Sequence, residues 1–249
     1  ALVVGLARPT WEVRVPEEAG TLMVVIDTSV SMEATDVAPS RLEAAIEAAR
    51  SFVDSLPDGL LVGLVSFDRG TRVMSPTRDH EAVELAIRRL TTGPGTAAGE
   101  AVYAALDAIA SAGGAAPTNR KQTAAIVLLS DGVTTVGRPV EIAAATAAEQ
   151  GVPVTTIAFG TSAGTVFVQG ELIPVPADPQ TMAAVADTTG GRFFEAFSAD
   201  QLRSVYSDIG SRVGFRTEKR DVGMRFVAVG ATLLLLALGG SIFWSGRML

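Results

Sequence analysis

Oxygen-bearing side chains gather directly after an apolar segment near the start of the chain. Asp27, Ser29 and Ser31 occupy every second position after residues 22–26 (LMVVI). In an extended loop alternate side chains project to the same side, so these three oxygens are expected to converge. Carboxylate and hydroxyl oxygens are hard ligands that suit Mg²⁺ or Mn²⁺. The spacing therefore predicts a divalent-cation site that begins at this loop.

Two further segments carry oxygen side chains that are expected at the same site. Thr96 closes the Gly-rich segment 93–96 (GPGT), and Asp131 follows an apolar run (AIVLL) and one serine. Asp27 and Asp131 together give the site a charge of −2, which a divalent cation would neutralise. Taken singly, each residue is better explained as a turn or helix-capping residue, but their joint occurrence favours the metal site. Asp36 is interpreted as a residue that supports the following helix or the site rather than as a ligand.

The elements that must position these loops alternate between strands and helices. Continuous apolar runs, typical of strands buried on both faces, occur at residues 22–26, 60–67, 125–129 and 154–159. Amphipathic helices are predicted at residues 41–55, 80–90, 99–111, 140–150, 179–188 and 200–213. A hairpin turning at Gln169-Gly170 is expected at 166–175, and a last short strand at 193–197. This alternation predicts an α/β fold with a doubly wound, mostly parallel central sheet, helices on both faces and ligands at the carboxyl ends of the strands.

Both ends of the chain are apolar. Residues 226–246 contain no charged residue, and their first nineteen residues would rise about 28 Å as a helix, close to the roughly 30 Å hydrocarbon core of a bilayer. They are predicted to form a transmembrane helix, preceded by a basic juxtamembrane segment at 212–225 that contacts lipid headgroups and followed by a tail at 247–249. Residues 1–9 are interpreted as the tail of a truncated N-terminal transmembrane segment, with an ordinary first strand as the alternative. This leaves residues 10–211 as the globular domain.

The composition narrows the classes of function. The chain has no cysteine and a single histidine, His80, which excludes disulfides, a thiol nucleophile and multi-histidine metal sites and argues against a Ser-His-Asp triad. Its net charge of −7 would repel a phosphate backbone, so no nucleic-acid partner is expected. Residues 160–164 (GTSAG) match the G-x-S-x-G pattern of a nucleophile, but a hairpin rather than a helix is expected after them. A catalytic Ser162 is therefore not expected.

These motifs together resemble the metal-ion-dependent adhesion site (MIDAS) of von Willebrand factor A (vWA) domains. Asp-x-Ser-x-Ser after a first strand, a threonine in a Gly-rich loop and Asp-Gly after a later strand occur in the family's order, and the resemblance covers residues 20–210. It implies that the metal ligands are Asp27, Ser29, Ser31, Thr96 and Asp131. It also implies that the serines and the threonine touch the ion, whereas the aspartates often act through water.

Further segments resemble the bacterial BatA-type vWA membrane proteins. These are residues 32–36, 41–45 (RLEAA) and 188–194 (TTGGRFF), together with the final apolar segment. The resemblance implies a bacterial cell-membrane protein that works with MoxR-type AAA+ ATPases. Five basic against two acidic residues in 212–225 would favour a cytoplasmic domain by the positive-inside rule. The family pattern of upstream spans instead implies an extracytoplasmic domain, which is the orientation predicted here.

The sequence thus favours a non-enzymatic binding module on a membrane anchor. Five protein groups around Mg²⁺ would leave one position of an octahedron open for an Asp or Glu carboxylate of a protein partner. One alternative is a structural membrane scaffold with a vestigial metal site, and another is a metal-dependent hydrolase. The hydrolase would need a base or nucleophile beside the ion, and the three loops hold no histidine or lysine. Metal titration separates these functions, because a scaffold binds no metal and a hydrolase shows turnover.

Overall fold

The computed structural model describes residues 10–16, 20–113, 123–132, 134–168, 170–212 and 215–221, which fall into two compact units. The larger unit, within Glu17–Gly214, holds the described helices and a central sheet. The smaller unit is an antiparallel pair of strands, β1 (Thr10–Pro16) and β10 (Phe215–Asp221). Strand β10 falls within the predicted juxtamembrane segment 212–225, for which the sequence predicts no strand.

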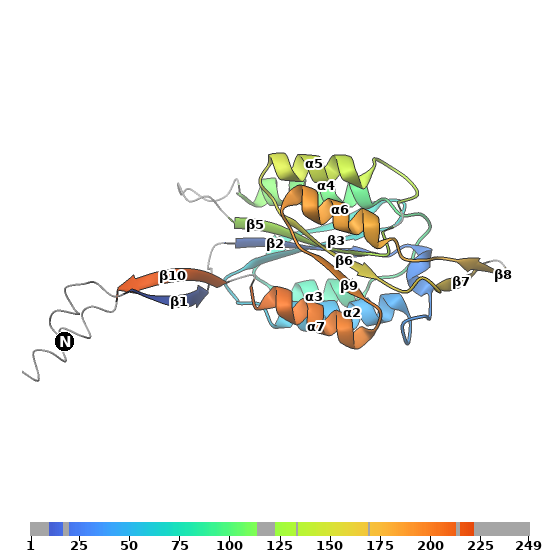
Figure 1. The fold of residues 1–249 in the computed structure, drawn as a ribbon, viewed down its shortest axis with the longest axis horizontal. Coiled ribbons are helices and arrows are strands. Elements are labelled where there is room, and N and C mark those ends of the chain that lie inside the picture. The colour runs from blue at the N-terminus through green and yellow to red at the C-terminus, as the bar shows by residue number, and fades with distance from the viewer. Residues whose placement is uncertain are drawn as a thin grey trace, which may run out of the picture. The chain divides into compact units, whose positions relative to one another are not determined.

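The larger unit is built on a six-stranded sheet in the order β4-β3-β2-β5-β6-β9 (Figure 1). Its strands are β2 (Gly20–Asp27), β3 (Leu61–Phe67), β4 (Thr71–Thr77), β5 (Thr123–Ser130), β6 (Val154–Phe159) and β9 (Phe193–Ala196). All run parallel except β4, which pairs antiparallel with β3 at one edge. A separate hairpin consists of β7 (Thr165–Val168) and β8 (Glu171–Pro174).

Helices cover both faces of this sheet (Figure 1). One face carries α2 (Arg41–Asp54), α3 (His80–Arg88) and α7 (Ala199–Gly210). The opposite face carries α4 (Ala98–Gly113), α5 (Val140–Glu149) and α6 (Pro179–Thr189). Because apolar side chains from both faces of β2 are buried under these helices, this strand reads as a continuous apolar run in the sequence.

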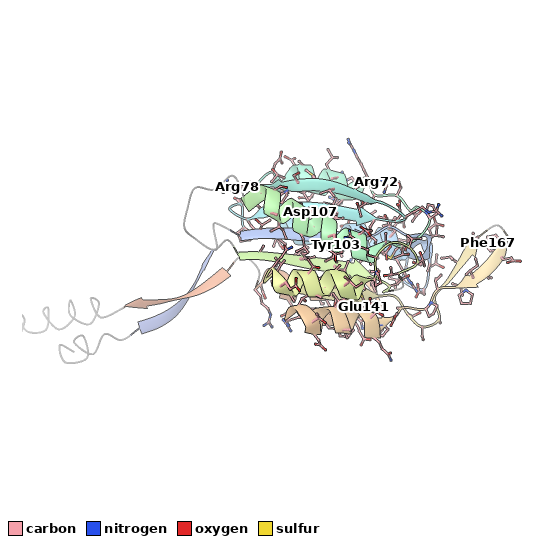
Figure 2. The ribbon with its side chains drawn as sticks, turned by 90° about the horizontal axis from the view of Figure 1, so that it is seen from above. Arg72, Arg78, Tyr103, Asp107, Glu141 and Phe167 are labelled. Carbon is pink, nitrogen blue, oxygen red and sulfur yellow. The ribbon has the colours of Figure 1, made fainter. Side chains whose placement is uncertain are left out.

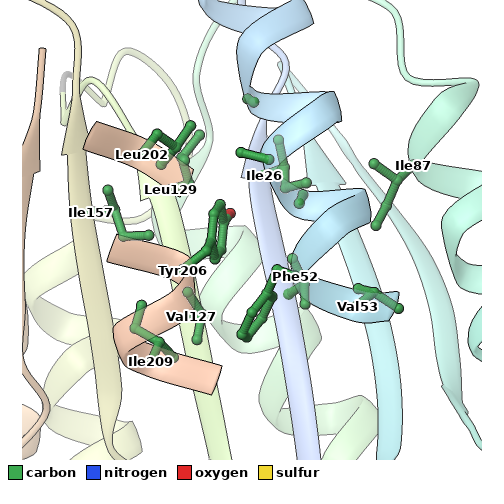
Figure 3. Packing of buried hydrophobic residues seen from close by; sticks show 14 of the residues in the cluster. Ile26, Phe52, Val53, Ile87, Val127, Leu129, Ile157, Leu202, Tyr206 and Ile209 are labelled. Atoms are coloured by element: carbon green, nitrogen blue, oxygen red, sulfur yellow. The ribbon is translucent and has the colours of Figure 1, made fainter. Parts of the chain in front are cut away.

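Packing in the core under α2 and α7 fixes α2, the helix that comes after the loop with Ser29 and Ser31. Phe52 of α2 stacks on Tyr206 of α7 with ring centroids 4.8 Å apart (Figure 3). Such aromatic pairs contribute about 0.5–1.5 kcal/mol beyond the area they bury. Burial raises the pKa of the Tyr206 hydroxyl. This packing holds α2 in place. Helix α2 begins at Arg41, next to the carboxyl ends of the parallel strands, which together form the carboxyl edge of the sheet. The amino ends of the same strands form the amino edge.

The path of the chain diverges at the carboxyl ends of two neighbouring central strands, β2 and β5. After β2 the chain passes to α2 on one face, whereas after β5 it passes to α5 on the other (Figure 1). Ligands of open α/β sheets bind where the chain diverges in this way, at the carboxyl ends of the strands. The ends of β2 and β5 are the places at which the sequence puts Asp27 and Asp131.

The predicted fold class is confirmed: the sheet is mostly parallel, doubly wound and covered on both faces. The hairpin expected at 166–175 is also present, as β7 and β8. The sequence does not predict β4, because this edge strand has exposed or half-buried side chains and no apolar run. The predicted transmembrane helix 226–246 and the segment 1–9 lie outside the described residues. Within the described ranges, no helix is both long and apolar enough to cross a membrane.

Candidate metal centre

Asp27 is the last residue of β2, and its side chain is wholly buried. Its Oδ1 accepts a hydrogen bond from the backbone N–H of Ser29 at 2.8 Å. Its Oδ2 accepts one from the hydroxyl of Ser130, the last residue of β5, at 2.5 Å. These bonds tie the ends of the two central strands together and hold Asp27 in place. Ser130 is not among the predicted ligands, although its position directly before Asp131 at a strand end is a usable signal in the sequence.

The two serines follow a tighter path than the sequence predicts. Residues Val30–Glu33 form a short 3₁₀ helix, η1, with Ser29 at its N-cap, so the predicted extended loop is wrong beyond Ser29. The hydroxyls nevertheless converge, because the 3₁₀ turn curls the chain back on itself, and Ser29 Oγ lies 2.8 Å from Ser31 Oγ. The predicted convergence of these two side chains is therefore confirmed, although its assumed cause is not.

Thr96 is brought to the same edge by backbone hydrogen bonds. The N–H of Gly93 donates to the Thr28 carbonyl at 2.8 Å, which joins the Gly-rich loop to the loop after β2. The N–H of Thr96 donates to the Thr135 hydroxyl at 2.8 Å, and the Thr96 carbonyl accepts from the Thr135 N–H at 2.9 Å. The Gly-rich loop is thus fixed between the segments that follow β2 and β5, with Thr96 buried.

Asp131 follows β5 and is buried as well. Its backbone carbonyl accepts a hydrogen bond from the N–H of Asp178 at 2.6 Å. Its Oδ2 accepts one from Nη1 of Arg41 at 3.4 Å. The first contact fixes the backbone of this loop, and the second places a buried positive charge beside the carboxylate.

Four of the five predicted ligands line one cavity of about 310 Å³. The residues that line it are Ser29, Val30, Ser31, Gly95, Thr96, Asp131, Thr135, Pro174, Val175 and Pro176. The fifth predicted ligand, Asp27, lies outside the lining and is joined to it through Ser29. The structure therefore brings together the three loops that the sequence singled out, and adds the segment that follows β8.

Arg41 is a residue of this site whose role the sequence pattern does not reveal. It is the first residue of α2, yet its side chain is wholly buried. Its Nε and Nη2 each donate to one carboxylate oxygen of Asp36 at 2.8 Å. A two-point contact of this kind fixes the geometry of both partners. Asp36 therefore supports the site, as predicted, and it does so by holding Arg41 beside Asp131.

The G-x-S-x-G segment at 160–164 is explained by Arg41. A Cβ atom at Gly160 would lie 2.4 Å from Cζ of Arg41, and a Cβ at Gly164 would lie 1.9 Å from its Nη2. Gly160 also has φ +127°, a conformation that other residues rarely adopt. The two glycines make room for the guanidinium group. Their spacing is a signal in the sequence for a close approach of another group, but it does not identify Arg41 as that group.

Two carboxyl groups of the site have pKa values shifted in opposite directions. Burial and the charge of Asp131 raise the pKa of Asp27 to about 7. Burial also raises the pKa of Asp36, but hydrogen bonds from Arg41 and Thr161 outweigh this effect and hold that pKa at about 2. The Arg41–Asp36 pair is neutral, so it adds no net charge to the site. A divalent cation would relieve the repulsion between Asp27 and Asp131.

Comparison with known proteins places the chain in a family. The model of the von Willebrand factor type A domain matches residues 22–133. A UPF0353 protein of Mycolicibacterium vanbaalenii is 38% identical over 256 residues, which cover 100% of this chain and 76% of that protein. A UPF0353 protein of Mycobacterium tuberculosis is 39% identical over 253 residues, covering 98% and 76%. The chain belongs to the UPF0353 family.

Solved structures share the fold of this UPF0353 chain. BatB from Bacteroides thetaiotaomicron has a TM-score of 0.64 and 22% identity, covering 77% of this chain and 98% of its own. An aerotolerance-related membrane protein from Bacteroides fragilis has a TM-score of 0.67 and 23% identity, covering 77% and 97%. Proximal thread matrix protein 1 of the mussel byssus, with a zinc-occupied MIDAS motif, has a TM-score of 0.57 and 19% identity, covering 88% and 51%. These similarities show that this UPF0353 chain has the vWA fold.

The donor chemistry of the cavity fits a divalent metal ion. The predicted ligands Ser29, Ser31, Thr96 and Asp131 line it, and their hydroxyl and carboxylate oxygens are hard ligands. In the part of the chain that the structure describes, no cluster of three or more His, Cys, Asp or Glu side chains is placed to hold a metal. An ion in this UPF0353 protein would therefore depend on the hydroxyls of Ser29, Ser31 and Thr96, and not on acidic side chains alone.

Proposed function

We propose that this UPF0353 chain is a membrane-anchored vWA module that holds Mg²⁺ or Mn²⁺ and binds a protein partner through that ion. The proposed ligands are Asp27, Ser29, Ser31, Thr96 and Asp131. The observation that carries the proposal is the cavity in which four of these residues meet, next to the buried carboxylate of Asp27. Five protein groups would leave one of six positions free, and an Asp or Glu carboxylate of the partner would fill it.

The proposed ligands would contribute to ion binding in different ways. The hydroxyls of Ser29, Ser31 and Thr96 point to direct contact, because they line the cavity. Asp27 accepts the N–H of Ser29 and fixes the first loop, and because it lies outside the cavity lining it would hold the ion through water. When bound, the ion supplies an electrophilic position for a partner's carboxylate. The lining holds no histidine, lysine or cysteine, which favours binding over catalysis.

The metal-binding part of the proposal is tested by thermal unfolding of the intact protein with and without Mg²⁺ or Mn²⁺. At about 100 times its dissociation constant an ion stabilises by about 2.7 kcal/mol, which for a domain of this size raises Tm by roughly 5–10 °C. Asp27→Asn should abolish this increase, whereas Asp58→Asn, at an exposed carboxylate, should retain it. An increase that survives in Asp27→Asn contradicts the site. The absence of any increase in the unmodified protein favours the scaffold, and turnover with bound metal favours the hydrolase.

We also propose the finer, BatA-like role. The module would be anchored in a bacterial cell membrane with its vWA domain outside the cytoplasm, in a complex with a MoxR-type AAA+ ATPase. The support is the sequence resemblance at residues 32–36, 41–45 and 188–194 and the fold shared with an aerotolerance-related membrane protein. Cross-linking in cells should recover the ATPase, directly or through other membrane subunits. Protease added to intact spheroplasts should digest the domain, and protection until lysis would reverse the proposed orientation.

A further inference from the structure

The β7–β8 hairpin carries large apolar side chains out from the larger unit. Phe167 is 70% exposed and Leu172 67% exposed, and the two lie directly opposite each other in the register of the pair. Figure 1 shows the hairpin projecting from the end of the sheet at which the strands finish, and Figure 2 shows Phe167 on it. Two adjacent, exposed side chains of this size are unlike singly scattered surface residues and point to a contact surface.

The apolar face of the hairpin leads into the metal-site cavity. Because side chains alternate along a strand, Pro174 stands on the same face as Leu172 and its partner Phe167. Pro174 lines the cavity together with Ser29, Ser31, Thr96 and Asp131. The opposite face carries Val166, which is buried, and its partner Ile173, which is 42% exposed and so less exposed than Phe167 and Leu172. One continuous surface therefore runs from the cavity along Pro174 to Leu172 and Phe167.

The base of the hairpin is fixed to the same residues that build the site. The carbonyl of Val175 accepts a hydrogen bond from Nη2 of Arg41 at 3.0 Å, and Nη1 of Arg41 donates to Asp131 at 3.4 Å. The N–H of Val175 donates to the Gly164 carbonyl at 2.8 Å. The apolar face is thus held at a set distance from the predicted ligands, as a surface for recognition requires.

The larger unit connects to the rest of the chain at the amino edge of the sheet, where the parallel strands begin. Strand β2 begins there at Gly20, and α7 ends there at Gly210, beside Ser55 at the end of α2 (Figure 1). The hairpin and the cavity share the opposite, carboxyl edge. A surface that faces away from both connections favours a separate protein over the chain's own flanking segments as its occupant.

We propose that the cavity and the hairpin face form one docking surface for an extended protein segment. In this segment an Asp or Glu that completes the metal site is followed or preceded by a large apolar side chain that packs on Phe167 and Leu172. A strand advances about 3.3 Å per residue, so Leu172 lies about 7 Å beyond Pro174, and the apolar side chain belongs within about two to four residues of the acid. The inference rests on the proposed metal-dependent function and names the chemistry of its partner.

The test uses the intact protein in detergent and a displayed library of random dodecamer peptides, selected with Mg²⁺ and, separately, with a chelator. The Mg²⁺-dependent peptides should combine Asp or Glu with Leu, Ile, Phe or Met within four positions. The double variant Phe167→Ser, Leu172→Ser should bind them about tenfold more weakly. A matched double variant at exposed apolar positions of the helices, Leu85→Ser with Ile142→Ser, should bind them as the unmodified protein does.

Metal binding is measured on the same samples by thermal unfolding, so the two proposals fail in different ways. If Mg²⁺ does not raise Tm, the proposed function fails. If Mg²⁺ raises Tm equally in the unmodified protein and in the hairpin variant, the metal site is supported. The proposed docking surface is then judged by how strongly each variant binds the selected peptides. Selected peptides without an apolar residue, equal binding by both double variants, no selected peptide at all, or self-association through the hairpin would each overturn the docking surface.

Discussion

The two edges of the central sheet both collect acidic side chains, but only one edge buries them. At the carboxyl edge Asp27 and Asp131 are buried, and Asp36 is locked to the buried Arg41. At the amino edge a hollow of about 720 Å³ lies between the end of α2 and the start of α3. The exposed acids that line it are Asp54, Asp58, Asp79 and Glu81. Burial with converging hydrogen bonds, rather than the number of acids, therefore distinguishes the candidate site from a solvated surface.

The largest effect on the contrast between the two edges is expected when the buried guanidinium group of Arg41 is removed. Arg41→Met keeps most of the apolar volume of the side chain but leaves Asp36 and Asp131 without the guanidinium group. Deleting one partner of a buried ion pair costs about 3–5 kcal/mol, so the free energy of unfolding in urea should fall by that amount. Arg88→Met, at an exposed arginine of the amino-edge hollow, should change it by less than about 0.5 kcal/mol. Similar losses in both variants would contradict the difference between the edges.

A smaller effect is expected from acid. The pKa of Asp36 is lowered to about 2, so its ionised form stabilises the folded state above pH 4 and this stabilisation is lost as the pH falls toward 2. The shift corresponds to at most about 2 kcal/mol. In chemical unfolding from pH 7 to pH 2, the difference between the unmodified protein and Asp36→Asn should be widest above pH 4 and should shrink toward pH 2. Asp58→Asn is the matched control, and a difference between Asp36→Asn and the unmodified protein that stays constant with pH would refute the assignment.

The smallest effect is expected at the amino edge. Neutralising Asp54, Asp58 and Glu81 together to Asn, Asn and Gln should change the free energy of unfolding by no more than about 0.5 kcal/mol, because exposed charges are well screened. Any change should vanish in about 1 M salt, where the screening length is about 3 Å. Unfolding curves at low and high salt measure both points. A large loss that persists in salt would show that these acids are structural and would remove the contrast.

The sequence predicts the parts of the fold that follow from local apolar patterns. The buried strands β2, β3, β5 and β6 are visible because both of their faces are covered. The edge strand β4 is not visible, because its side chains are exposed or half-buried and its pairing with β3 is decided by the turn before it. The pairing of β1 with β10 joins opposite ends of the chain, and no local pattern reports such a contact.

The candidate site, too, has residues whose placement the sequence predicts and residues whose placement it does not. Asp27, Ser29 and Asp131 lie at or just after the carboxyl ends of two parallel, neighbouring strands, so their meeting at one edge follows from the strand order. Arg41 could not be placed from its position at the start of an amphipathic helix, where an arginine is normally solvated. Its burial depends on Asp36 on one side and the backbone of residues 160–164 on the other, which only the folded chain brings together.

The register of β1 with β10 has a mechanical consequence for the smaller unit. Thr10 and Asp221 form the outermost pair, so a force that separates the chain before Thr10 from the chain after Asp221 pulls on both strands from the same end. The ladder then opens as a zipper, one pair at a time, because only the outermost hydrogen bonds carry the load. A force that pulls both flanking segments in the same direction puts no load on the hydrogen bonds between the two strands. The pair therefore yields readily when its flanks are pulled apart and withstands tension that they share.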